Sequence, residues 1–181
     1  GDPAREIPAG TQVLFAASRD QLAAVSPDAG VRWAHPADLG LGRRDRAPRV
    51  CPTGASVIVA ERDRVISRDA ATGEPRWEFE IPDRGITSAT VSGGVAVIVS
   101  RFLDTGKPAE VYGLDTVLGI QLWKLGVIGD RFHPEIKVSD GRFVLLPLRG
   151  TQAGVHDLST GQPLSAPNTG QLNAREAQSA W

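Results

Sequence analysis

Arginine side chains occupy most of the segments that could carry chemistry in this 181-residue chain, which has 20 Lys or Arg and 21 Asp or Glu residues. A guanidinium is a rigid fork of N–H donors that fits carboxylates and phosphates. Two of these arginines are followed directly by Phe, and aromatic and Arg side chains are frequent anchors of interfaces. We therefore expect a surface for a protein partner or an anionic ligand, formed by Arg44, Arg46, Arg62, Arg84, Arg101, Phe102, Arg131, Phe132 and Arg149.

The acidic residues beside these arginines favour a plainer interpretation. Asp45, Asp63 and Asp130 each adjoin at least one of them, and exposed loop charges that pair with neighbours are common and weak. The formal net charge is −1, whereas a nucleic-acid-binding domain would be clearly basic. We expect no nucleic-acid partner, and both interpretations of the arginines stay open.

Other chemistries have weaker support. The Asp-Thr-Gly segment at 104–106 resembles part of an aspartic protease site, but it occurs once and fits a turn better. His35, His133 and His156 lack metal-ligand spacing, and no Gly-x-Ser-x-Gly elbow exists. Cys51 is alone and lies in an apolar strand pattern, which favours a small buried residue over a nucleophile. We predict no catalytic residue, no metal and no cofactor.

The elements that would position these residues form a repeat. Four turn glycines recur at intervals of roughly 42 to 46 residues, a period typical of propeller blades: Gly30, Gly73, Gly119 and Gly161. A second Gly turn precedes each of them, at Gly10, Gly54, Gly94 and Gly141. With 20 Gly and 13 Pro breaking the chain, long helices are excluded and an all-β fold follows.

One repeat has room for four short strands. In the second repeat we predict strands at 49–51, 56–60, 64–68 and 76–81. The strand at 56–60 is almost wholly apolar, which is typical of a strand covered on both faces. Each repeat should therefore be a small antiparallel sheet stacked between two neighbours.

The turn before the fourth strand has a recurrent composition. Asp69, Asp115 and Asp157 each precede Gly73, Gly119 and Gly161 by four residues, and Trp33, Trp77 and Trp123 follow the turns at one position. A carboxylate there can accept backbone N–H groups, and Gly takes the positive φ that closes the turn. In the first repeat Asp28 comes only two residues before Gly30, so that turn should be one residue tighter.

The segments "DAATGEPRW" and "DTVLGIQLW" resemble the tryptophan-docking repeat of the PQQ-like β-propellers. This resemblance implies four-stranded blades at about 1–43, 44–83, 84–129 and 130–166, with 167–181 as a polar tail or the start of a further blade. It also implies that the three Trp residues pack between adjacent blades and that the Asp and Gly residues of the turns belong to the same structural docking motif. Four blades are few, so we favour a partial or composite ring, completed by absent sequence or a second copy, over a closed four-bladed ring.

The resemblance also limits the function. The family includes quinoprotein dehydrogenases, the propeller lipoprotein of the outer-membrane β-barrel assembly machinery, and sensor domains of membrane proteins. We expect a non-catalytic scaffold outside the cytoplasm, in the periplasm or cell envelope, that presents its Arg-rich loops to a protein or an anionic envelope component. We expect contact with a membrane only through a partner or through an anchor that is absent from this chain. The alternatives are a fragment of a PQQ-dependent dehydrogenase and a sensor ectodomain of a membrane kinase or transporter.

Overall fold

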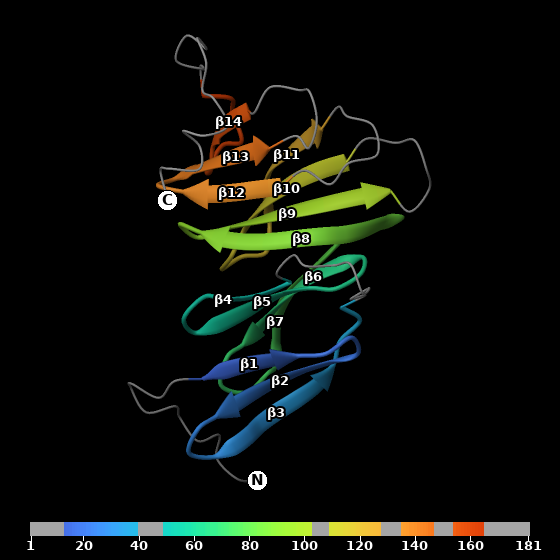
Figure 1. Ribbon diagram of the computed structural model, residues 1–181, viewed down its shortest axis with the longest axis vertical. Helices are drawn as coiled ribbons and strands as arrows, with labels where there is room; N and C mark the ends of the chain where they lie inside the picture. Colours follow the sequence, from blue (N-terminus) through green and yellow to red (C-terminus); the bar gives the residue numbers. More distant parts are fainter. Residues whose placement is uncertain (1–12, 40–48, 103–108, 128–134, 147–153, 165–181) are drawn as a thin grey trace.

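The computed structural model describes residues 13–39, 49–102, 109–127, 135–146 and 154–164, and its regular elements are all strands. The strands form four antiparallel sheets that follow one another along the chain (Figure 1). In each sheet, neighbouring strands are consecutive in sequence. Every sheet is therefore a simple meander, as expected for short strands separated by Gly turns.

The first sheet contains β1 (Leu14–Ala17), β2 (Gln21–Ser26) and β3 (Gly30–Pro36). The second contains β4 (Val50–Pro52), β5 (Ser56–Ala60), β6 (Arg64–Asp69) and β7 (Pro75–Glu80). The third contains β8 (Arg84–Ser92), β9 (Val95–Phe102), β10 (Ala109–Asp115) and β11 (Gln121–Val127). The fourth contains β12 (Glu135–Ser139), β13 (Arg142–Leu146) and β14 (Gly154–Asp157).

The strands predicted for the second repeat agree with β4 to β7 to within one residue at either end. In the fourth sheet, the place of a fourth strand is taken by a single antiparallel bridge between Pro163 and His156. The first sheet has three described strands, and the chain before residue 13 lies outside the described residues. Ala24 lies opposite Trp33 in the first sheet, whereas Ser67 lies opposite Trp77 in the second, so the first turn connects its strands with one residue fewer. The tight first turn is therefore observed.

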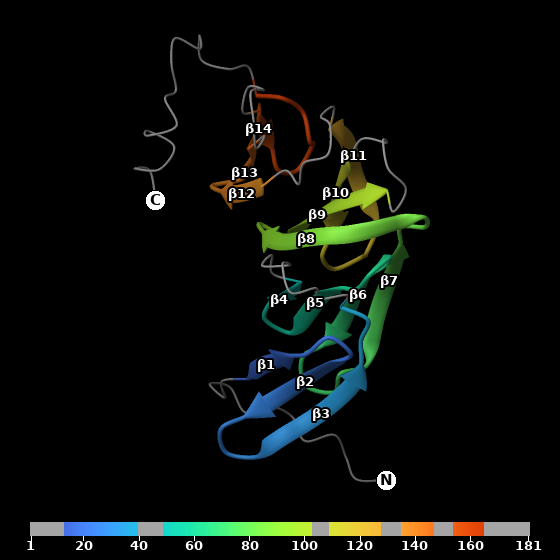
Figure 2. The same ribbon diagram turned by 45° about the vertical axis from the view of Figure 1, so that its right-hand side comes forward.

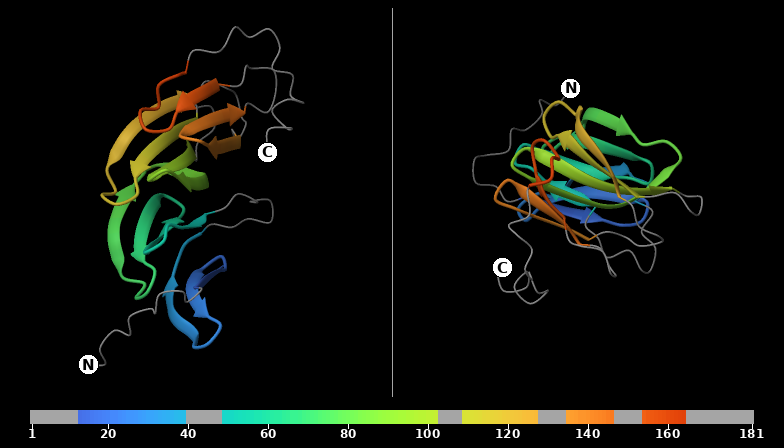
Figure 3. Two further views of the ribbon diagram at one scale, coloured as in Figure 1. Left: turned by 90° about the vertical axis from the view of Figure 1, so that its left-hand side faces the viewer. Right: turned by 90° about the horizontal axis from the view of Figure 1, so that it is seen from above.

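The four sheets stack face to face along an arc, in chain order (Figures 2 and 3). On the inner side of this arc β1 contacts β4, β4 contacts β8, and β8 contacts β12. The first and fourth sheets lie at opposite ends of the arc, so the described strands form part of a ring (Figure 3). The predicted fold class is confirmed: the sheets are blades of a β-propeller in an open, partial arrangement.

One apolar cluster fills each of the three spaces between neighbouring blades. The central strand β5 explains why this requires a continuous apolar run. Val57 and Val59 belong to the cluster shared with blade 1, whereas Ile58 and Ala60 belong to the cluster shared with blade 3. Since alternate residues of a strand point to opposite faces, a strand between two blades needs apolar side chains at every position.

Two sets of connections occupy opposite ends of each blade. We call the turn that runs from Asp69 to Gly73, and its equivalents in the other blades, the docking turn. Next to the docking turns, Ala70 N–H donates to Ala55 O, Thr116 N–H to Gly94 O and Leu158 N–H to Gly141 O. These bonds tie the turn between the third and fourth strands to the turn between the first and second. At the other end, Ala37 N–H donates to Asp20 O and Ile81 N–H to Asp63 O, so the linkers that follow the first and second blades each join a hairpin there. We call the first end the turn face and the second the linker face.

A β-bulge precedes each Trp on the outermost strand. The register shifts opposite Ala24/Val25, Ser67/Arg68 and Gly113/Leu114, which leaves Arg32, Arg76 and Leu122 as the extra residues. A bulge bends its strand and turns the next side chain to a new direction. Here the next side chain is Trp33, Trp77 or Trp123.

Each of these indoles lies against the docking turn of the following blade. Trp33 Nε1 donates to Ala70 O (3.1 Å), Trp77 Nε1 to Thr116 O (3.0 Å) and Trp123 Nε1 to Leu158 O (2.8 Å). The ring covers the turn glycine so closely that a Cβ on Gly73, Gly119 or Gly161 would lie within 2.8 Å of indole atoms. The same contact therefore recurs at all three blade junctions.

Because glycines with and without this contact share one backbone conformation, the contact can be tested alone. Gly73 and Gly54 both have positive φ (+78° and +73°), but only Gly73 has side chains within 4 Å of an added Cβ. Gly54→Ala should cost about 1 kcal/mol for the left-handed backbone. Gly73→Ala should cost about 1 to 3 kcal/mol more, because Trp33 and His35 must move. Urea denaturation of the two variants measures the difference, and equal losses would contradict a packed junction.

Candidate functional site

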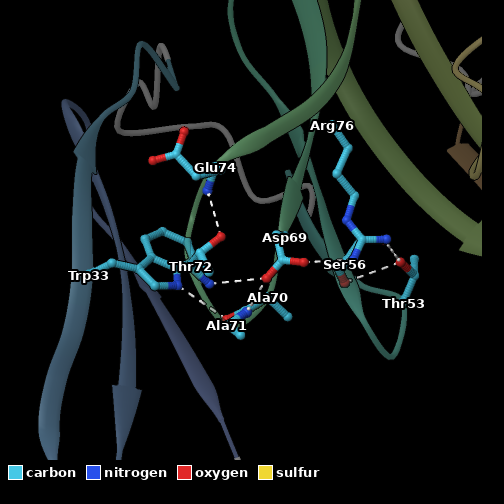
Figure 4. A network of polar contacts seen from close by, with 9 residues as sticks. All are labelled: Trp33, Thr53, Ser56, Asp69, Ala70, Ala71, Thr72, Glu74 and Arg76. Atoms are coloured by element: carbon cyan, nitrogen blue, oxygen red, sulfur yellow. Dashed lines mark hydrogen bonds and ion pairs between the residues drawn. The ribbon is translucent and has the colours of Figure 1, made fainter. Parts of the chain in front are cut away.

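The Asp of each docking turn acts on backbone groups, as the residue pattern suggests. Asp69 Oδ1 accepts hydrogen bonds from Ala71 N–H (2.8 Å) and Thr72 N–H (3.0 Å), and the next blades repeat this with Asp115 and Asp157. Figure 4 shows this turn in blade 2, with Trp33 of blade 1 directed onto it. The turn therefore keeps its shape while its next carbonyl, that of Ala70, accepts the indole N–H.

The second carboxylate oxygen distinguishes the turns from one another. Asp69 Oδ2 pairs with Arg76 Nη2 at 2.6 Å, and this hydrogen bond, together with the two backbone donors, lowers the pKa of Asp69. The hydroxyls and backbone N–H groups of Ser159 and Thr160 lower the pKa of Asp157. In blade 3 the bulge residue is Leu122, so no Arg stands where Arg76 pairs with Asp69.

The docking contact also needs a small residue that the repeat analysis did not identify. Ala24, Ser67 and Gly113 lie directly opposite Trp33, Trp77 and Trp123 on the neighbouring strand. A Cβ on Gly113 would lie 2.1 Å from Trp123 Cε2, so the indole occupies the space above it. The signal in the sequence was a residue no larger than Ser at the same place in three repeats.

Four of the predicted binding residues come together on the linker face. In the antiparallel register of β8 and β9, the backbone of Arg84 lies opposite that of Phe102, and the backbone of Gly85 lies opposite that of Arg101. Arg62 lies in the hairpin between β5 and β6, and its carbonyl accepts the N–H of Ile86 at 2.8 Å. The backbones of Arg62, Arg84, Arg101 and Phe102 thus meet where blades 2 and 3 adjoin.

The arginines on this face differ in their partners. Arg64 is held by Glu61 Oε2 (2.6 Å) and Glu78 Oε1 (2.9 Å), and the hydrogen bond that Arg64 donates to Glu61 is the main cause of its raised pKa. Arg62 and Arg101 are exposed, and neither has a hydrogen bond or ion pair with its side chain among the described residues. Their charge is therefore open to an external anion.

An open hollow of about 400 Å³ lies beside Arg64, between blades 1 and 2. It is lined by Arg19, Asp20, Pro36, Ala37, Asp38 and Arg64. Nearby, Glu61 is 2% exposed, and its Oε1 has no hydrogen-bond partner within the described part of the chain. The mixed charges give the hollow no strong preference for one sign.

The other predicted residues are dispersed or lie outside the described ranges. Outside them are Arg44, Arg46, Arg131, Phe132, Arg149, His133 and the 104–106 segment. His35 packs beside Trp33, with ring centroids 5.5 Å apart. His156 stacks on Phe143, which in turn stacks on Trp123 at 4.8 Å. Both described histidines therefore contribute to junction packing.

Cys51 fits the interpretation as a packing residue. Burial raises the pKa of its thiol to about 11, and Sγ lies 3.5 Å from Ala89 O in the next blade. A thiol with this pKa is almost entirely protonated at neutral pH and is a poor nucleophile. Within the described ranges, no three His, Cys, Asp or Glu side chains gather in a way that could hold a metal ion.

The sequence of the chain matches a known family. A family model described as outer membrane protein assembly factor BamB matches residues 18–176. The chain therefore belongs to this family of PQQ-like β-propellers, as the repeat resemblance predicted. Among curated proteins, a sequence search found no significant match.

Solved structures show the same fold at low sequence identity. BamB from Moraxella catarrhalis matches with a TM-score of 0.61 at 19% identity, over 84% of this chain and 47% of that one. The quinohemoprotein alcohol dehydrogenase ADHIIG from Pseudomonas putida HK5 matches with a TM-score of 0.64 at 16% identity, over 85% and 32%. The Pan2 WD40 domain of Neurospora crassa matches with a TM-score of 0.58 at 15% identity, over 85% and 50%.

This chain thus spans half or less of each of these three propellers. They establish the fold alone, because propellers with the same fold serve many functions. In the described part of the chain, no helix has the length and apolar character needed to cross a membrane.

The ion pair of Asp69 gives the stability of blade 2 a dependence on pH. The pKa of Asp69 is lowered in the folded state. Its contribution to the free energy of unfolding is therefore complete above the ordinary Asp pKa of about 4, and it is lost as the pH falls through the lowered pKa. Asp69→Asn should lower the free energy of unfolding at pH 7 by about 0.2 to 1 kcal/mol, as for exposed pairs.

The control for this prediction is Asp115→Asn, since Asp115 accepts the same two turn N–H groups without an Arg partner in the described chain. In thermal unfolding followed from pH 7 into the acid range, Asp69→Asn should have a lower melting temperature than Asp115→Asn at neutral pH. The two should converge as the pH falls, and a gap that widens in acid would refute the assignment.

Proposed function

We propose that this chain is a non-catalytic propeller scaffold outside the cytoplasm, whose linker face binds a protein partner or an anionic component of the cell envelope. One observation carries the proposal: Arg62 and Arg101 are exposed, lie at adjoining tips of blades 2 and 3, and have no partner among the described residues. Guanidinium groups in this state bind carboxylates or phosphates at little desolvation cost.

The contrast with other cations supports this choice. Arg64, Arg76 and Lys124 each pair with a carboxylate at 3.0 Å or less. The protein therefore neutralises these cations internally, whereas Arg62 and Arg101 keep their charge for solvent or a ligand. The backbones of Arg84 and Phe102 lie beside them in the register of β8 and β9.

The family supports the cellular setting. Its description names an outer membrane protein assembly factor, and a BamB structure matches most of this chain. Assembly factors act by contact with other proteins, so a scaffold with a charged loop face is consistent with this membership. We infer a periplasmic or envelope location on this basis.

A quinoprotein dehydrogenase is the second candidate, because a quinohemoprotein alcohol dehydrogenase matches the fold equally well. The described residues show no centre for quinone and calcium. The chain has one Cys, so it cannot form a pair of adjacent cysteines. The described residues also contain no cluster of three His, Cys, Asp or Glu that could hold the ion. A sensor ectodomain would share the binding chemistry proposed above.

The proposal is tested by replacing Arg62 and Arg101 with Ala. Binding is measured to vesicles that contain phosphatidylglycerol and, separately, to a poly-glutamate peptide, which represent the lipid and protein arms. Each Arg near an anionic surface contributes about 1 kcal/mol, so the double variant should bind roughly thirtyfold more weakly to the preferred probe. Its melting temperature should stay unchanged, because neither side chain has a partner in the described structure.

The matched control is Arg142→Ala, which removes one exposed charge at the opposite, turn face. It should bind like the wild type, whereas the single Arg101→Ala variant should not. Wild-type protein that binds neither probe would overturn the proposal. Dye reduction after addition of quinone, calcium and an alcohol would instead establish the dehydrogenase.

A further inference from the structure

The turn between β10 and β11 exposes an unusual amount of apolar surface. Val117 is 79% exposed, Leu118 64%, Ile120 54% and Leu122 42%. These are four of the six large hydrophobic side chains that are exposed in the described part of the chain. Clustered aliphatic side chains in water mark interaction surfaces far more often than isolated ones do. We call this set, with β11, the blade 3 edge.

The other blades show that the turn does not require these residues. Counted from the turn Asp, the same four positions hold Ala71, Thr72, Glu74 and Arg76 in blade 2, and Ser159, Thr160, Gln162 and Leu164 in blade 4. All three turns have the same Asp hydrogen bonds and the same Trp contact. The aliphatic side chains in blade 3 therefore contribute nothing that the turn itself needs.

The backbone of the blade 3 edge is also free to pair. β11 is the outermost strand in the order β11-β10-β9-β8, and it lies on the convex side of the arc (Figure 3). Blades 2 and 4 have Pro75 and Pro163 two residues after the turn Gly, where blade 3 has Gln121. Proline removes an N–H donor and protects a sheet edge against a further strand. Blade 3 lacks that protection where its side chains are most apolar.

The charges at this edge favour one kind of occupant. In blade 2, Arg76 pairs with the outer oxygen of Asp69 at 2.6 Å, but Leu122 takes the place of that Arg in blade 3. Lys124, also on β11, is already 3.0 Å from Glu110. Among the described residues, Asp115 therefore has no cationic partner beside its aliphatic neighbours.

We propose that the blade 3 edge binds an extended strand of a partner protein, which adds to β11 as a fifth strand. The partner segment has aliphatic side chains on the face that meets Val117, Leu118 and Ile120, and a basic residue that pairs with Asp115 as Arg76 pairs with Asp69. An extended strand is the occupant because a second backbone can pair with the row of N–H and C=O groups that an edge strand leaves to solvent. This surface is separate from the linker face and does not depend on it.

The test exchanges the blade 3 turn for that of blade 2, by Val117→Ala, Leu118→Thr, Ile120→Glu, Gln121→Pro and Leu122→Arg. The probe is a fluorescent synthetic peptide of alternating Val and Thr with a central Arg, and binding to the whole chain is followed by anisotropy. The wild type should bind the probe. The exchanged variant should bind at least about tenfold more weakly, a difference of 1.4 kcal/mol. Because this turn already exists in blade 2, the variant should retain its melting temperature.

Changes in the peptide provide tests that need no protein variant. A probe methylated on alternate backbone nitrogens should lose binding, since it cannot form a strand ladder, and a probe with central Glu should bind more weakly than the one with Arg. Equal binding of the methylated probe would overturn strand addition. Equal binding of the Arg and Glu probes would remove the role of Asp115.

Two further measurements separate this proposal from its rivals. The Arg62→Ala/Arg101→Ala variant should bind the strand probe like the wild type, so failure of the linker face leaves this proposal standing. The mass of the wild-type protein in solution should not depend on concentration. If it doubles, and the exchanged variant stays monomeric, the edge binds a second copy and the proposal is wrong.

Discussion

The contact between an indole and the turn of the next blade is the constraint on which the rest of the structure depends. Each blade is a sheet too small to bury its own faces, so it is stable only when neighbours cover them. The indole N–H satisfies a turn carbonyl that would otherwise face an apolar junction, and its ring covers a glycine. The same side chain thus links two blades at each of the three described junctions.

This contact accounts for several residues that have no common chemistry. The bulge at Arg32, Arg76 or Leu122 directs the Trp toward the next blade. The small residue opposite makes room for the ring, and the turn Asp shapes the loop that carries the accepting carbonyl. Because all these features serve one geometry, they recur together, and a change in one would require changes in the others.

The sequence predicted the fold because the strongest constraints fall on residues that are easy to recognise. Trp, Gly and Asp at near-constant intervals identified the blades and their junctions. The small residues Ala24, Ser67 and Gly113 were not identified, since a residue that leaves space has no chemical signal of its own. Arg62, Arg84, Arg101 and Phe102 could be nominated singly, but their assembly depends on how neighbouring blades meet. The exposure of Val117 and Leu118 could not be predicted either, because an apolar residue in a turn usually finds cover.

Repetition turns variation within the chain into evidence about function. Positions that build the junction change little between blades, whereas positions that leave the junction intact are free to differ. At the tip of the docking turn, blade 2 has Glu74 and Arg76 and blade 3 has Ile120 and Leu122, on backbones with the same turn bonds. A polar residue there is neutral for folding, while exposed aliphatic residues favour aggregation unless something covers them. Their presence in one blade therefore has a physical reason outside the fold, and a binding partner supplies it.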